Sequence, residues 1–127
     1  MMQVLQPPGW ARPRGFSHGI AATGKLVFIA GQIGIEEKGF SGQFRQTLKN
    51  ILAVLAEAGG RPEHVVRLTW YVLDKQEYLG ALKDVGKAYR ELMGRNFPVM
   101  AVVQVGGLVE PEARLEIEAT AVIPEAS

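Results

Sequence analysis

The chain has 127 residues, of which 47% are hydrophobic and 21% charged, as is ordinary for a soluble globular protein. A formal net charge of +1 gives no electrostatic argument for a nucleic-acid or membrane partner, and the lack of cysteine excludes disulfides and thiolate chemistry. No signal-peptide segment opens the chain, and no apolar run approaches the roughly 20 residues of a membrane span. We therefore expect one cytoplasmic domain over residues 1–127, long enough to bury a core.

The first part of the chain predicts an arm followed by a hairpin. Residues 1–15 are rich in proline and glycine, with Trp10 as the large anchor, so we expect an extended arm on the surface or on a neighbouring subunit. Residues 16–22 and 25–30 can each form a strand. Residues 23–24 supply a two-residue turn between them, which predicts a hairpin.

Two helices and a strand are predicted in the middle of the chain. Apolar residues recur at helical spacing over residues 43–58 and again over 75–93, and a glycine, Gly59 or Gly94, follows each run. Residues 65–73 alternate as a strand between them. Each helix has one apolar stripe, so both helices are expected on the same face of a sheet.

The C-terminal region supplies two further strands. Residues 97–105 form a β-branched, uninterrupted run, and residues 115–122 alternate strictly, with Glu116 and Glu118 on one face. The link between the two runs is rich in turn residues, which predicts a loose, irregular hairpin. The element order is therefore ββαβαββ, an α+β sheet with two helices on one face.

The other face of this sheet is expected to carry a mixture of polar and apolar side chains. It is too apolar for open solvent and too polar for a dry core, so a homo-oligomer packing these faces or edges together would cover it. The residues assigned to this mixed face are Arg67, Thr69, Val102, Gln104, Glu116 and Glu118.

Three features of the sequence could carry chemistry, and each also has a structural explanation. Glu116 and Glu118 are about 6.5–7 Å apart along one strand, so one could serve as a proton shuttle, or both could simply face water. The backbone N–H groups around Gly31 could bind an anion, although glycines at a strand exit are also ordinary turn residues. His64 is expected in a surface loop, and neither His64 nor His18 has the spacing of a metal site, so no metal is expected.

The order of several motifs resembles the RidA/YjgF family of imine/enamine deaminases. The resemblance extends from about residue 15 to residue 123. The motifs that carry it are Phe16-Ser17-His18-Gly19-Ile20, Phe28-Ile29-Ala30-Gly31-Gln32-Ile33, the helix 46–55, Val65-Val66-Arg67-Leu68-Thr69, Phe97-Pro98 and Glu116-Ile117-Glu118-Ala119-Thr120-Ala121. It implies a chorismate-mutase-like subunit in a homotrimer, with the sheets lining a central barrel and the helices outside. It also implies a small-molecule substrate in clefts between subunits, and no cofactor.

The resemblance implies roles for particular residues. Family members hydrolyse 2-imino or 2-enamino acids to 2-keto acids and release ammonia, using a glutamate that handles water, a glycine that offers backbone contacts and an arginine that binds the carboxylate. Here Glu118 aligns with the glutamate and Gly31 with the glycine, whereas Met100 stands where the arginine is usual. Phe16 replaces a tyrosine, Val102 is counted among the substrate-contacting residues, and Ala30 and Gly86 replace a serine and an asparagine.

These departures point to an altered substrate preference. Met100 makes that wall of the cleft apolar and adaptable, which favours a neutral or apolar group at this position. His18 could supply a replacement polar contact, or could hydrogen-bond within its own subunit. The alternative function is a non-catalytic small-molecule-binding or stress-related interaction protein on the same scaffold. A ribonuclease or translation-inhibitor function gains little support from the near-neutral charge.

Overall fold

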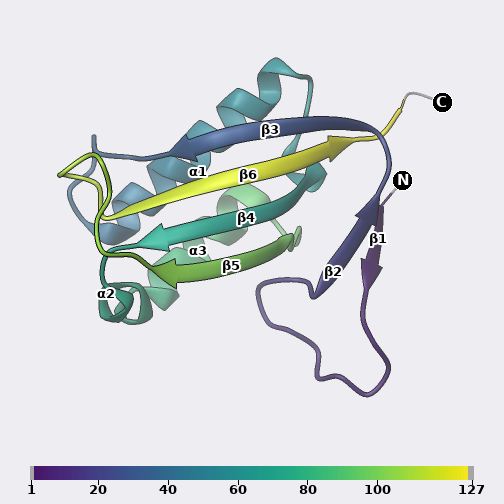
Figure 1. Cartoon of the computed structure of the whole chain (residues 1–127), viewed down its shortest axis with the longest axis horizontal. Coiled ribbons are helices and arrows are strands. Elements are labelled where there is room, and N and C mark those ends of the chain that lie inside the picture. The colour runs from purple at the N-terminus through teal and green to yellow at the C-terminus, as the bar shows by residue number, and fades with distance from the viewer. Residues whose placement is uncertain (1, 126–127) are drawn as a thin grey trace.

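The computed structural model describes residues 2–125 and combines a four-stranded sheet, a two-stranded ribbon and helices. In chain order the elements are β1 (Met2–Leu5), β2 (Gly19–Ala22), β3 (Lys25–Gln32), α1 (Phe40–Glu57), the 3-10 turn η1 (Pro62–His64), β4 (Val65–Val72), α2 (Lys75–Gly80), α3 (Leu82–Met93), β5 (Val99–Gln104) and β6 (Leu115–Ile123). The predicted α+β class, with the helices on one face of the sheet, is confirmed (Figure 1). No helix within residues 2–125 is both long and apolar enough to cross a membrane.

The main sheet has the strand order β3-β6-β4-β5, and α1 and α3 cover one of its faces (Figure 1). β6 is antiparallel to both of its neighbours, whereas β5 runs parallel to β4. The predicted hairpin between residues 97–105 and 115–122 is therefore wrong. A parallel pair needs a long crossover, and the helices α2 and α3 carry the chain from β4 back to the start of β5. The strand β6, apolar along one face, then takes a central place between β3 and β4.

The predicted hairpin between residues 16–22 and 25–30 is also wrong. β2 pairs antiparallel with β1, so the predicted arm contains a strand, and this ribbon projects away from the main sheet (Figure 1). β3 pairs with β6 instead. Gly24 makes the turn between ribbon and sheet at a φ of 148°, where a Cβ would collide with the Ile123 carbonyl oxygen. Only glycine allows this close approach without a shift of the backbone.

The alternation predicted for residues 115–122 is confirmed in β6. The residues buried against the helices, on what we call the covered face, are Leu115, Ile117, Ala119 and Ala121. Those on the opposite face, called the open face, are Glu116, Glu118 and Thr120. Two apolar side chains of β3 also lie on the open face, where Leu26 is 58% and Phe28 75% exposed.

Two strands depart from the faces predicted for them. Uninterrupted alternation over residues 65–73 predicts Val66 on the face of Leu68 and Val65 on the other face. A register shift between Val65 and Arg67 places an extra residue in β4, so Val65 is buried and Val66 is only partly buried. Such a bulge reverses the facing of the residues that precede it. Assigning Val102 and Gln104 to the mixed face is wrong as well. The parallel register with β4 places both on the covered face.

The two predicted helices form, one of them with a break. α1 begins three residues earlier than predicted, and its stripe of Phe44, Leu48 and Ile51 is fully buried against the sheet. The second helix is divided at Ala81, where the backbone leaves helical geometry (φ −104°, ψ 6°), so that α2 ends and α3 begins. The division changes the direction of the chain beside β5.

Candidate functional site

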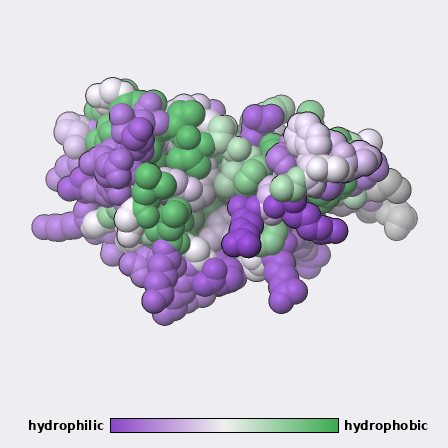
Figure 2. Space-filling view, turned by 90° about the horizontal axis from the view of Figure 1, so that it is seen from below, coloured by the Kyte–Doolittle hydropathy of each residue, from purple (hydrophilic) through white to green (hydrophobic). Residues whose placement is uncertain are grey.

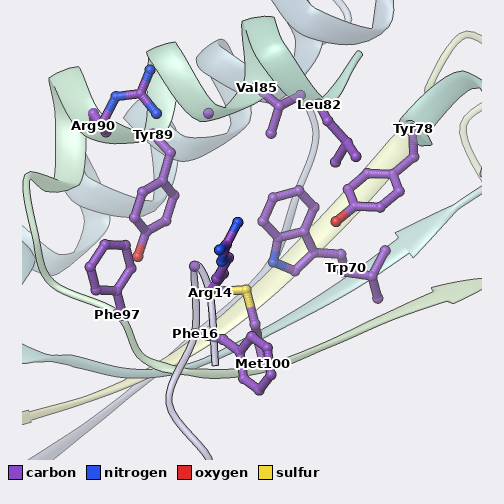
Figure 3. A pocket seen from close by; sticks show the side chains of 13 residues that line it. Arg14, Phe16, Trp70, Tyr78, Leu82, Val85, Tyr89, Arg90, Phe97 and Met100 are labelled. Carbon is purple, nitrogen blue, oxygen red and sulfur yellow. The ribbon is translucent and has the colours of Figure 1, made fainter. Parts of the chain in front are cut away.

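A cavity of about 530 Å³ lies between α3, the covered side of β4 and β5, and the segment that precedes β2 (Figure 3). This volume is typical of small-molecule sites. Its lining residues are Arg14, Gly15, Phe16, Trp70, Tyr78, Leu82, Val85, Gly86, Tyr89, Arg90, Phe97, Met100 and Val102. Aromatic and aliphatic side chains form most of this wall. Hydrophobic residues also reach the surface between hydrophilic ones on the side of the molecule shown in Figure 2.

The parallel pairing of β4 with β5 positions the floor of the cavity. Met100 stands opposite Leu68, and Val102 stands opposite Trp70, so both side chains point to the helix side of the edge strand. Both are partly buried and pack against the core. The edge strand is thereby the place where the core opens into a ligand-sized space.

The N-terminal segment closes one side of the cavity because it is fastened to the start of β5. The Ser17 backbone N–H donates to the Pro98 carbonyl at 3.2 Å, and the Ser17 hydroxyl donates to the Phe97 carbonyl. Ser17 is buried, so these bonds are shielded from water. They hold Phe16 against the cavity.

Aromatic rings form the rear wall. Trp70 stacks on Phe44 with ring centroids 4.9 Å apart. Trp70 and Tyr78 form a T-shaped pair with centroids 5.8 Å apart. Tyr89 stacks on Phe97 at 5.9 Å and donates its hydroxyl to the Asn96 carbonyl. Burial raises the pKa of Tyr78 and of Tyr89 above the ordinary value, so both phenols stay neutral near pH 7. The wall therefore presents neutral, flat surfaces.

A second group of predicted residues lies elsewhere. Gly31 sits where the β3–β6 register shifts, and a Cβ added there would collide with Glu116 Oε2. On the open face, the Tyr71 hydroxyl donates to Glu118 Oε1 at 2.7 Å, and this bond raises the Tyr71 pKa. Gly31, Glu116 and Glu118 are not among the residues that line the cavity.

The two histidines take different places. His18 is exposed and meets the rings of Trp10 and Phe16 edge-on at 5.0 and 5.5 Å. His18 does not line the cavity, although its ring contacts Phe16, which does line it. His64 accepts from the Arg61 backbone N–H at 2.9 Å through Nδ1, a local contact of η1. Within residues 2–125 no group of three or more histidine or acidic residues could hold a metal ion.

The structure thus brings together some predicted site residues and separates others. Phe16, Met100 and Val102 share the cavity, whereas His18, Gly31 and Glu118 lie outside it. Sequence reasoning missed the aromatic wall and the two arginines, because a helical stripe of aromatic residues is typical of core. The sequence carries no signal that separates a cavity wall from core, because the spacing within α3 or β5 does not record the distance between them. The lining residues that the sequence did not indicate are Arg14, Trp70, Tyr78, Tyr89, Arg90 and Phe97.

Comparison with known proteins gives consistent matches. The family model described as endoribonuclease L-PSP matches residues 11–123. A RutC family protein of Pyrococcus horikoshii is 33% identical over 129 residues, covering 95% of this chain and 98% of the relative. The human 2-iminobutanoate/2-iminopropanoate deaminase is 30% identical over 105 residues, covering 77% of this chain and 73% of the relative. The crystal structure of a Yersinia pestis protein of the Rid family, described as of unknown function, has a TM-score of 0.83 at 30% identity and covers 96% of this chain and 98% of its own.

The fold and the site define a class of protein, an α+β domain with a ligand-sized cavity beside the edge strand of its sheet. The comparisons place it more closely. The chain belongs to the RidA/YjgF family, as its motifs predict, and that family includes proteins named as imine deaminases.

Proposed function

We propose that the chain is a hydrolytic deaminase that acts on reactive imines or enamines and releases ammonia and a carbonyl product. The observation that carries the proposal is the shared cavity of Phe16, Met100 and Val102. These residues come from separate segments and occupy positions at which the family resemblance implies substrate contact. Relatives named 2-iminobutanoate/2-iminopropanoate deaminase, from human and Salmonella typhimurium, are each 30% identical to the chain.

The proposed reaction adds one water to the imine. The water oxygen bonds to the imine carbon while the C=N π electrons move to nitrogen, and the Glu118 carboxylate accepts a water proton. Nitrogen takes that proton, which gives a neutral carbinolamine, and Glu118 then carries the hydroxyl proton to the nitrogen. The C–N bond then breaks, so ammonia leaves and a C=O bond remains. The Gly31 backbone N–H would anchor the substrate, and general-base help of this kind is worth roughly 10²–10⁴-fold in rate.

A second glutamate competes for this role. Glu116 lies against Gly31, which is the predicted substrate anchor, whereas Glu118 accepts a hydrogen bond from Tyr71. The family alignment supports Glu118, and the contact with Gly31 supports Glu116. Replacing each carboxylate separately by its amide distinguishes the two, because the amide keeps the shape and loses the base.

The carboxylate and the cavity lie on different parts of one subunit, so the proposed site needs a second copy of the chain. We propose a homotrimer in which Glu118 and Gly31 of one subunit face the cavity of its neighbour. The exposed Phe28 and Leu26 on the open face support an assembly, because apolar side chains of this size favour burial.

The test is release of ammonia and carbonyl product from imines generated in situ, across a chemically broad panel. We expect acceleration by the wild type and a loss of about 10²-fold or more in Glu118→Gln. Glu116→Gln is the matched control and should retain most of the activity. The reverse order would assign the water to Glu116, and no acceleration by an intact assembly would contradict the deaminase proposal altogether.

The non-catalytic alternative rests on Met100, which removes the arginine that holds the substrate carboxylate in the family. A charge-assisted contact is worth about 1.5–3 kcal/mol, so its loss weakens transition-state binding by roughly tenfold to a hundredfold. Under this alternative, ligands bind without turnover and their affinity is unchanged in Glu118→Gln. Met100→Arg should raise the hydrolysis rate of small imino acids if the deaminase proposal is right, with correct folding checked by circular dichroism.

A further inference from the structure

We infer that the cavity selects an aromatic carboxylate, specifically a 2-imino acid with an aromatic side chain, and that Arg14 and Arg90 together recognise its carboxylate. The identity of the ligand as an imino acid rests on the proposed function. The recognition itself depends only on the cavity, so it can be measured without any catalysis.

The cavity wall is positively charged. Arg14 and Arg90 are the charged residues among those that line it, and no acidic residue joins them. Neither guanidinium forms an ion pair within residues 2–125, although other arginines of the chain do. Two unpaired cations at one opening attract an anion, and a guanidinium can bind a carboxylate through two parallel hydrogen bonds.

The two arginines lie where a ligand would enter the cavity. In Figure 3 the Arg14 side chain rises into the space flanked by Tyr89 and Trp70, and Arg90 lies along α3 near Tyr89. The Arg90 side chain passes close to Gly86, where an added Cβ would lie 3.3 Å from Arg90 Nη1. Both arginines are exposed, so an entering carboxylate meets them at the mouth of the cavity.

The wall also contains a buried hydrogen-bond donor that has no acceptor. Trp70 is 3% exposed, and its Nε1 is buried with no hydrogen-bond partner within residues 2–125. A buried N–H without an acceptor is unfavourable, so an acceptor on a ligand would stabilise it. In Figure 3 the indole nitrogen points toward Met100. A methionine changes rotamer readily, so Met100 can turn aside and let the face of a ligand ring, a weak acceptor, reach this N–H.

The body of the ligand follows from the rings. Between the arginines and Trp70 the wall consists of aromatic faces and edges, including Tyr78, Tyr89, Phe97 and Phe16. Aromatic pairs gain stabilisation beyond their buried area, which favours a flat aromatic group over a short aliphatic chain. Met100, where the family has its arginine, then serves as apolar wall, and the positive charge is supplied from Arg14 and Arg90 instead.

The experiment measures binding of unreactive probes. The chain has two tryptophans, so a Trp10→Phe background leaves Trp70 as the only fluorescent indole. We would titrate 3-phenylpropanoate, its uncharged amide 3-phenylpropanamide, and butanoate. We expect the aromatic acid to change Trp70 emission and to bind at least about tenfold more tightly than either the amide or butanoate.

Arginine variants then test the recognition directly. Arg14→Gln and Arg90→Gln should each weaken 3-phenylpropanoate about tenfold and leave the amide unchanged. The matched controls are Arg12→Gln on the same segment and Lys87→Gln on α3, neither of which lines the cavity. Equal binding of acid and amide, or equal losses in the controls, would overturn the inference. If the protein hydrolyses imines but does not prefer the aromatic acid, the inference fails and the proposed function stands. If it binds the aromatic acid with this preference but does not hydrolyse imines, the inference stands and the proposed function fails.

Discussion

The two faces of the main sheet differ in what a single chain can satisfy. On the covered face, Leu115 and Ile117 are fully buried, and α1 supplies a matching apolar stripe. On the open face, Phe28 is 75% exposed beside β6, which carries Glu118, and Arg67 lies on the next strand, β4. The covered face is packed by the helices, whereas the open face combines apolar and charged groups on which no helix among residues 2–125 packs.

The same contrast divides the proposed chemistry. The cavity belongs to the covered side of the edge strand and is formed within one chain by α3, β5 and the segment around Phe16. The candidate carboxylates belong to the open side, where Tyr71 holds Glu118. A site made from both sides would require two copies of the chain. A substitution could therefore disrupt the proposed site without unfolding the chain.

The largest expected effect is on the covered face. Ile117→Ala removes a fully buried side chain from β6 and should lower the free energy of unfolding by about 2–5 kcal/mol. The matched open-face change, Glu118→Ala on the next residue, should cost about 0.5 kcal/mol or less in a dissociated chain. Urea unfolding at low protein concentration measures both. Similar losses would mean that the two faces are equally packed in the single chain.

The second effect concerns assembly. Phe28→Ser removes an exposed apolar ring from the open face, whose burial between subunits would be worth about 1.5–3 kcal/mol, so subunit dissociation should become at least about tenfold easier. Sedimentation velocity over a range of concentrations measures the change. Val54→Ser is the control, since Val54 is 41% exposed on α1, away from the open face. A Phe28→Ser variant that associates as the wild type does would contradict the assembly proposed through this face.

Local pattern was enough to predict the buried faces of β6 and α1, and it was not enough to predict strand partners. The alternation of residues 115–122 and the stripe of α1 are properties of consecutive residues, so they could be read directly. Strand pairing depends on where distant segments meet. β5 follows β4 in parallel because two helices lie between them, and β2 joins β1 because Gly24 turns the chain away from β3.

The candidate site was predictable to a similar extent. Family motifs indicated Phe16, Met100 and Val102, which do share a cavity. The aromatic wall was interpreted as core, since Trp70 and Tyr89 lie on stripes that are indeed mostly buried. What distinguishes a cavity from a packed core is the distance between α3 and the edge strand, and no spacing within either element records that distance.

The smallest expected effect tests the polar contact of the open face by its pH dependence. The hydrogen bond to Glu118 raises the Tyr71 pKa in the folded state, so its stabilisation is fully present below the unfolded value of about 10 and is lost as the pH rises through the folded pKa. Tyr71→Phe lacks this bond. The wild type should therefore melt slightly higher than the variant between about pH 7 and pH 9, and the difference should shrink above about pH 10. A difference that persists unchanged at higher pH would show that Tyr71 stabilises the open face by packing alone.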